Sequence, residues 1–206
     1  HDALPIYFFA GVEHGAQKGV EHFNISLFCN TDSLKGANLS ILTNAIKKDM
    51  QGVQISALNN FATKGNGIQI GMLSNASTST FKGIQLAGIS NVSMGMKRGI
   101  QLAGAANICS SSMRGIQTAV YNYADTLNGS QIGLFNACIS HPRGVQIGII
   151  NYSRDTVAHK IGLVNVNPKT RIDLLSYIGT STKLNMALRF RNRSTYNIIG
   201  IGTHYM

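Results

Sequence analysis

The sequence has no tryptophan, only 3 prolines and only 13% charged residues. Charged residues make up about a quarter of an ordinary soluble domain; here Asn, Gln, Ser and Thr supply the polarity instead. No stretch reaches the roughly 18–20 consecutive apolar residues that a membrane-spanning helix needs. Aromatic residues amount to 7% and form no stacking platform beside the basic residues, which argues against nucleic acid as a partner.

Acidic residues are also scarce, with 8 Asp and Glu against 18 Lys and Arg, a formal net charge of +10. No acid lies between Asp49 and Asp125. Such an excess suggests an anionic partner, for example an acidic glycan or lipopolysaccharide, although it can equally serve solubility. The only glutamates, Glu13 and Glu21, offer no pair of carboxylates for glycoside hydrolysis. We therefore expect no enzyme and no catalytic residues.

The cysteines and histidines do not form a metal-binding or redox pattern. Cys29, Cys109 and Cys138 are three in number, so they cannot all pair with one another, and we expect them to fill the core. No two histidines stand at metal-ligand spacing, and we expect neither a metal nor a cofactor. The chain starts at His1, which we interpret as a processed or truncated product compatible with export.

What the sequence does contain is a phrase such as Gly-Val-Gln-Ile-Gly-Ile-Ile-Asn, which occurs ten times at intervals of 14–16 residues. A regular period of this length indicates one structural unit stacked on itself. Degenerate copies begin at His22 and Ala158. Between them, each copy begins with a glycine, namely Gly36, Gly52, Gly67, Gly83, Gly99, Gly115, Gly129 and Gly144.

Within each copy the residue types alternate. The first and third positions after the glycine are usually apolar, the second is an amide and the fourth is small, which predicts a β-strand. An asparagine then marks a corner of the chain, because Asn tolerates a left-handed backbone and bonds to it locally. The amides are predicted to stack into ladders, formed by Gln69, Gln85, Gln101, Gln117, Gln131 and Gln146 and by Asn75, Asn91, Asn107, Asn122, Asn136 and Asn151.

The alternation gives two faces without saying which one is inside. We assign the apolar first and third positions to the core and favour an exposed amide face, suited to hydrogen-bonding a sugar or another sheet. The alternative is a buried amide ladder, with the small residues allowing close packing of the sheets.

The repeats predict an all-β chain forming a short-coil β-solenoid of about ten 14–16-residue coils, because a meander would distinguish odd from even copies. Such a rod would be roughly 45–50 Å long. The alternative is an antiparallel meander or β-barrel. The array spans 22–170, between an N-terminal cap segment at 1–21 and a C-terminal segment at 171–206. The latter is predicted to contain strands at 172–178, 183–190 and 196–205, as a cap or as a pairing segment.

The repeated phrase, over 23–166, resembles that of bacterial surface repeat proteins with tandem copies of Gly-Val-Gln-Ile-Gly-x-x-Asn. The segment 196–202 is similar to strands that follow such arrays. The resemblance implies export and an extracellular, cell-surface or outer-membrane setting. It implies no reaction and supplies no catalytic residues.

The residue before the repeat glycine is often basic, and in a solenoid these residues would form one row, Lys35, Lys82, Arg98, Arg114 and Arg143. The row is either a track for a polyanion or a solvated corner. We expect a non-enzymatic structural or binding scaffold, engaged in adhesion or in binding an extended anionic glycan. An outer-membrane β-barrel component and a carbohydrate-active β-helical enzyme are the alternatives. Self-association through the rod ends and membrane association are further expectations.

Overall fold

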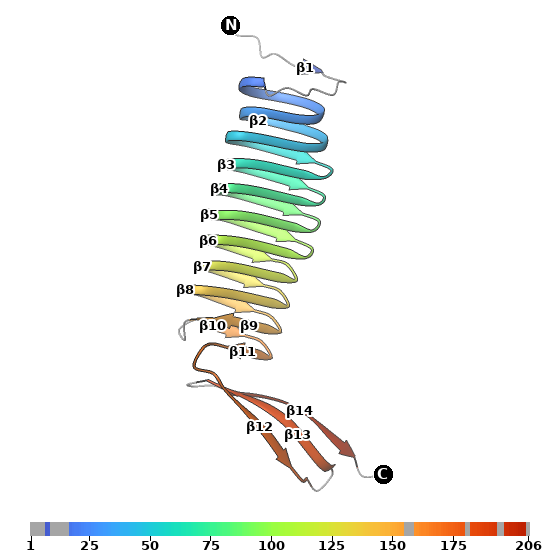
Figure 1. Cartoon of the computed structure of the whole chain (residues 1–206), viewed down its shortest axis with the longest axis vertical. Helices are drawn as coiled ribbons and strands as arrows, with labels where there is room; N and C mark the ends of the chain where they lie inside the picture. Colours follow the sequence, from blue (N-terminus) through green and yellow to red (C-terminus); the bar gives the residue numbers. More distant parts are fainter. Residues whose placement is uncertain (1–6, 9–16, 155–158, 180–181, 193–195, 205–206) are drawn as a thin grey trace.

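The computed structural model describes residues 7–8, 17–154, 159–179, 182–192 and 196–204. They form an all-β structure in which parallel coils stack into a β-solenoid of about eight turns (Figure 1). None of the described residues forms a helix that could cross a membrane. The solenoid strands are β1 (Tyr7–Phe8), β2 (Gln17–Ser56), β3 (Asn59–Gly71), β4 (Ser74–Ala87), β5 (Ser90–Ala103), β6 (Ala106–Thr118), β7 (Tyr121–Ile132), β8 (Phe135–Ile147), β9 (Ile150–Ser153), β10 (His159–Ile161) and β11 (Val164–Val166).

Successive coils pair in parallel and in register, so equivalent residues of the repeat lie above one another. Gly67 pairs with Gly83 and Gly83 with Gly99, and the glutamines and asparagines pair in the same way. Parallel pairing excludes the antiparallel meander for the array. In the last, degenerate copy of the repeat, the strands β10 and β11 are only three residues long each.

Two features require glycine at the repeat position: its backbone conformation and the close approach of the neighbouring coil. Gly83 has a φ of +126°, a conformation that residues with a side chain rarely adopt. A Cβ at this position would also overlap with the carbonyl oxygen of Gly67 in the preceding coil. The glycine column therefore lets neighbouring coils approach to β-sheet distance at this edge.

Two ladders of amide side chains run through the interior. Each glutamine Nε2 donates to the Oε1 of the preceding coil's glutamine at 2.8–2.9 Å, from Gln69 to Gln146. Each asparagine Nδ2 donates in the opposite direction, to the Oδ1 of the following coil's asparagine at 2.8–3.0 Å, from Asn44 to Asn165. Because the donors point in opposite directions, the dipoles of the two ladders largely offset one another.

The expectation that the amide face is exposed is wrong, since Gln54 and the glutamines of the ladder are fully buried. The first- and third-position residues point outward instead and are half-buried or exposed. The physical reason is that stacking pairs each buried amide with its equivalents above and below, which removes the usual penalty for burying it. The apolar residues of these positions are therefore not the core.

The apolar core lies at the other end of the flattened coil, beside the repeat glycine. It consists of two buried columns. The first has large side chains, those of Leu34, Met50, Phe81, Met96, Met113 and Leu127, and the second has mostly small ones, those of Ile46, Ala62, Cys109, Ala124 and Cys138. Phe81 occupies the space beside Gly65, where a Cβ would overlap with its ring. All three cysteines are buried, as expected from the sequence, and Cys109 and Cys138 belong to this core.

An antiparallel sheet of β12 (Arg171–Tyr177), β13 (Thr182–Arg191) and β14 (Tyr196–His204) follows the solenoid. It confirms the three C-terminal strands expected from the sequence. Asn192 and Asn197 attach it to the last coil, where their side chains donate to the backbone carbonyls of Asn165 and Leu163. Most of the proposed N-terminal cap lies outside the described residues, but β1 pairs in parallel with Asn24 and Ile25 of β2.

Candidate functional site

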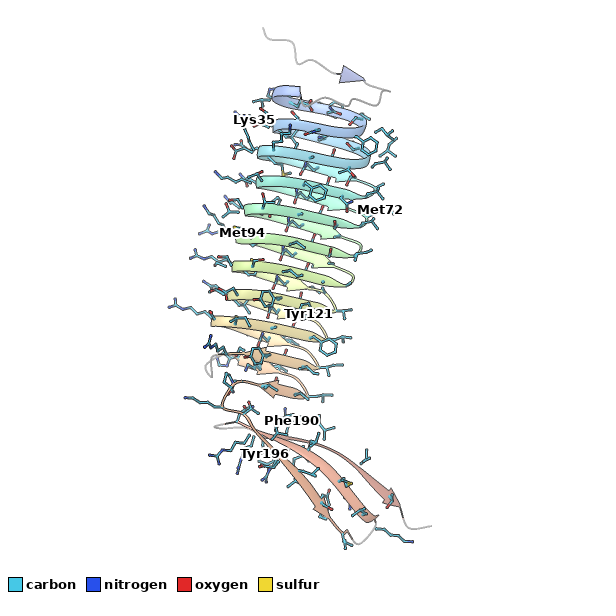
Figure 2. The ribbon with its side chains drawn as sticks, in the orientation of Figure 1. Lys35, Met72, Met94, Tyr121, Phe190 and Tyr196 are labelled. Carbon is cyan, nitrogen blue, oxygen red and sulfur yellow. The ribbon has the colours of Figure 1, made fainter. Side chains whose placement is uncertain are left out.

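The basic residues before the repeat glycines lie on one edge of the flattened coil, and the corner residues that follow the strand lie on the other. Figure 2 shows Lys35 on the first edge and Met72 on the opposite one. We call the first the basic edge; its residues Lys35, Lys82, Arg98, Arg114 and Arg143 are all exposed. Lys35, Lys82 and Arg114 point outward because the residue before each of them is buried in the core, namely Leu34, Phe81 and Met113.

Only part of the expected row comes together. Lys82 pairs directly with Arg98, and the pairing of Gly99 with Gly115 places Arg114 on the next coil. Asn128 separates Arg114 from Arg143, which puts these two about 10 Å apart along the rod. Gln51 and Asn66 stand between Lys35 and Lys82. The cations therefore form a cluster on three coils rather than a track along the whole rod.

A β-bulge adds a cation that was not among the expected site residues. Phe81 pairs with Met96, but the next residue, Lys82, pairs with Arg98, so Lys97 is an extra residue in this coil. Bulges redirect side chains and are common beside functional sites. The signal is present in the sequence, because two residues separate the buried Met96 from its glycine where the neighbouring copies have one.

The cluster surrounds a hollow of about 470 Å³. Side chains of Lys82, Lys97, Arg98 and Arg114 line it, together with the hydroxyl-bearing residues Thr80, Ser111 and Ser112. None of the residues that line it is a carboxylate. Ammonium, guanidinium and hydroxyl groups are donors for anionic oxygens, so the hollow can hold a sulfate, phosphate or carboxylate group.

The ion pairs found among the described residues lie outside the cluster. Lys48 pairs with Asp32 at 2.9 Å and Lys64 with Asp49 at 3.8 Å, both nearer the N-terminus. Within the described ranges no ion pair involves Lys82, Lys97, Arg98 or Arg114. Their mutual repulsion is unrelieved, and an anion bound between them would relieve it.

Among the described residues, no three His, Cys, Asp or Glu side chains come together in a group that could hold a metal ion. Burial raises the pKa of the Cys109 thiol and raises the pKa of Cys138 to about 11, which keeps both thiols protonated and unreactive near neutral pH.

The geometry of the basic edge is thus a cationic, hydroxyl-lined hollow on a rigid stack of coils. No family model, curated protein or solved structure matches the chain.

Proposed function

We propose that the protein is a non-enzymatic scaffold of a bacterial cell surface that binds an anionic glycan at its basic edge. The observation that carries the proposal is the cluster of Lys82, Lys97, Arg98 and Arg114 around one hollow, without an acidic partner among the described residues. The surface setting rests on the resemblance of the repeat to bacterial surface repeat proteins. An acidic capsular glycan and the charged sugars of lipopolysaccharide share this chemistry.

The size of the cluster suggests a short segment of glycan rather than a long one. Lys82 and Arg114 are two coils apart, about 10 Å along the rod, and a hollow of about 470 Å³ falls in the range of small-molecule sites. One or two charged sugar residues would fill it. Thr80, Ser111 and Ser112 would bond to the sugar hydroxyls, which a bare cationic surface could not do.

A binding scaffold agrees with the rigidity of the coils. The side chains that would contact the glycan project from β-strands held above and below by in-register pairing. Such a surface is ordered before the ligand arrives, so little conformational entropy is lost on binding. The hollow offers anionic groups a binding site, but no histidine or carboxylate that could act as a general acid or base lines it.

The proposal is tested on an array of neutral and anionic glycans with the native protein and two variants. In the first, Lys82, Arg98 and Arg114 are replaced by Ser; in the second, the outlying Lys35 and Arg143 are replaced by Ser. A charge-assisted hydrogen bond contributes about 1.5–3 kcal/mol, so the first variant should lose at least tenfold in affinity for each cation removed. The second variant should stay within about threefold of the native protein.

The same assay contains the results that would overturn the proposal. Absence of binding to every anionic glycan would overturn it, and so would equal losses in the two variants, because the second lacks only cations outside the cluster. Binding should also weaken as salt rises, since the hollow is open to solvent and its charges are screened.

A further inference from the structure

A second surface of the solenoid carries almost no polar groups. We call it the outer apolar face; it consists of the outward first- and third-position residues of seven coils, Val53, Ile55, Ile68, Ile70, Ile84, Leu86, Ile100, Leu102, Ile116, Thr118, Ser130, Ile132, Val145 and Ile147. Ile55, Leu102, Ile116, Ile132 and Ile147 are each 37–41% exposed. None of the fourteen is charged, and only Thr118 and Ser130 are polar.

The face is large for an uncovered surface. Seven coils at strand spacing extend about 34 Å, and two columns of outward side chains are about 14 Å wide, which gives on the order of 500 Å². This is at the upper end of the apolar patches found on soluble monomers, where such patches are often functional. Exposed Met72, Leu73 and Ile89 extend it around the adjoining edge.

We propose that the outer apolar face packs against the same face of a second copy of this chain. Rows of Ile, Leu and Val repeat along it at the strand spacing of about 4.8 Å, and the same face of another copy matches it in both spacing and composition. Two flat sheets of this kind interdigitate, as in steric zippers. A pair would bury about 1,000 Å² in total, the area at which specific interfaces begin.

The shape of the outer apolar face also fits a second copy of the chain. A hollow of about 580 Å³ runs beside the ridge of Ile70, Leu86 and Leu102, over the small residues Gly71, Ala87, Gly88 and Ala103. A two-fold axis would place the ridge of each copy against the groove of the other. The opposite face of the rod also exposes Phe61, Val92, Tyr121 and Phe135, but it mixes them with Asn59, Ser74, Thr78 and Ser90, so its apolar rows are less continuous.

Charge selects the orientation of the pair. If the rods were antiparallel about this face, both basic edges would lie on the same side and repel one another. In a parallel pair the basic edge of each copy lies beside the apolar corner of the other, about 20 Å from its counterpart. We therefore infer a parallel pair, with the two anion-binding hollows facing away from each other.

Sedimentation equilibrium, at protein concentrations from micromolar to 100 µM, tests whether two copies pair. The native chain should form a dimer, and replacing Leu86 and Leu102 by Lys should raise the dissociation constant at least 100-fold. Replacing Phe61 and Val92 by Lys, on the opposite face, adds the same charge and should leave the dimer intact. Circular dichroism should show unchanged β-structure in all three, because the four side chains point away from the core.

A native chain that stays monomeric at every concentration would overturn the proposal, as would equal dissociation of the two variants. A third arm uses neutral phosphatidylcholine vesicles. If the monomer binds them and the Leu86 and Leu102 variant does not, lipid and not a second copy covers the face, which also overturns the proposal. Glycan binding by the dimer is independent of these outcomes, since the basic edge is untouched.

The orientation is measured with a spin label on Ile41→Cys, at the exposed corner near the N-terminal end of the rod. The native cysteines are buried, so the label attaches to the new one. A parallel pair should give a label separation of about 20 Å, the width of the coil, and an antiparallel pair one nearer the rod length of about 38 Å. The longer separation would contradict the charge argument.

Discussion

At the scale of single residues, the repeat glycine controls how closely coils approach. We expect Gly83→Ala to lower the stability of the folded chain by about 1–3 kcal/mol or more, because it forces a positive φ on alanine and a clash with the Gly67 carbonyl. The matched control is Gly95→Ala, where the nearest atom would be Thr80 Cγ2 at an ordinary 3.7 Å. Urea denaturation followed by circular dichroism should show a lower midpoint for the first variant and an almost unchanged midpoint for the second.

A second prediction at the residue scale concerns how much the glutamine ladder stabilises the folded chain. In Gln117→Leu, the Oε1 of Gln101, the carbonyl of Tyr123 and the Nε2 of Gln131 each lose a hydrogen bond. In Gln146→Leu, at the end of the ladder, only the Oε1 of Gln131 and the carbonyl of Tyr152 do, because the Oε1 of Gln146 has no hydrogen-bond partner. Each orphaned group costs about 1–3 kcal/mol, so the internal variant should be the less stable by about that amount. Equal melting temperatures would show that the ladder does not stabilise the coil.

A third prediction concerns Cys138. Its pKa is raised by burial from 9.0 to about 11 in the folded chain. Between these two values the unfolded thiol is ionised while the folded one is still protonated, so folding stability should fall as the pH rises from 9 to 11. Urea denaturation at pH 8, 9.5 and 11 measures the effect, and Cys138→Ala should show a smaller decline. A decline of the same size in that variant would assign it to other groups.

The residues also show where sequence reasoning succeeds and where it stops. The alternation of Ile68, Gln69 and Ile70 predicts which residues share a face, but a period of two is the same whichever face is inside. The cue that resolves it is identity: Gln recurs from copy to copy because its partner is another Gln, whereas the first and third positions vary among Val, Ile, Leu, Thr and Ser. Hydrophobicity alone assigned the core to the wrong side.

At the scale of the structural element, the bulge in β5 adds Lys97 to the cations that line the hollow. Deleting Lys97 would restore the spacing found in β4 and β6, where one residue separates the buried side chain from the glycine. We expect the deletion variant to fold and to bind anionic glycan more weakly than Lys97→Ser, which removes the charge but keeps the bulge. Isothermal titration with both variants makes the comparison. Equal affinities would mean that the bulge contributes charge but no geometry.

The elements differ in how far the sequence determines them. The repeated strand and its corner asparagine were predictable because both occur in every copy, and so were β12, β13 and β14 from their alternation. The gaps at Gln51, Asn66 and Asn128, and the adjacency of Lys82, Arg98 and Arg114, could be read from the sequence once the coils were assumed to stack. The hollow could not, because it also depends on Thr80, Ser111 and Ser112 beside the cations. Lys97 was missed because the register of the repeat, and not its composition, carries the signal.

At the scale of the whole molecule, stacking turns side chains that occur once per repeat into continuous surfaces. Amides become buried ladders, β-branched residues become the outer apolar face, and cations on adjacent coils become one hollow. The solenoid of about eight turns should be about 38 Å long at strand spacing. This is shorter than the expected 45–50 Å, because the copies at the two ends are degenerate.

The account's central claim is that adjacency on neighbouring coils, and not net charge, makes the anion site. A charge-conserving variant tests it: Arg98→Asn combined with Gln51→Arg keeps the net charge of +10 but leaves Lys97 as the one cation of the coil between Lys82 and Arg114. Its affinity for the anionic glycan that the native chain binds best, measured by isothermal titration, should fall at least tenfold. An affinity equal to that of the native chain would contradict the account.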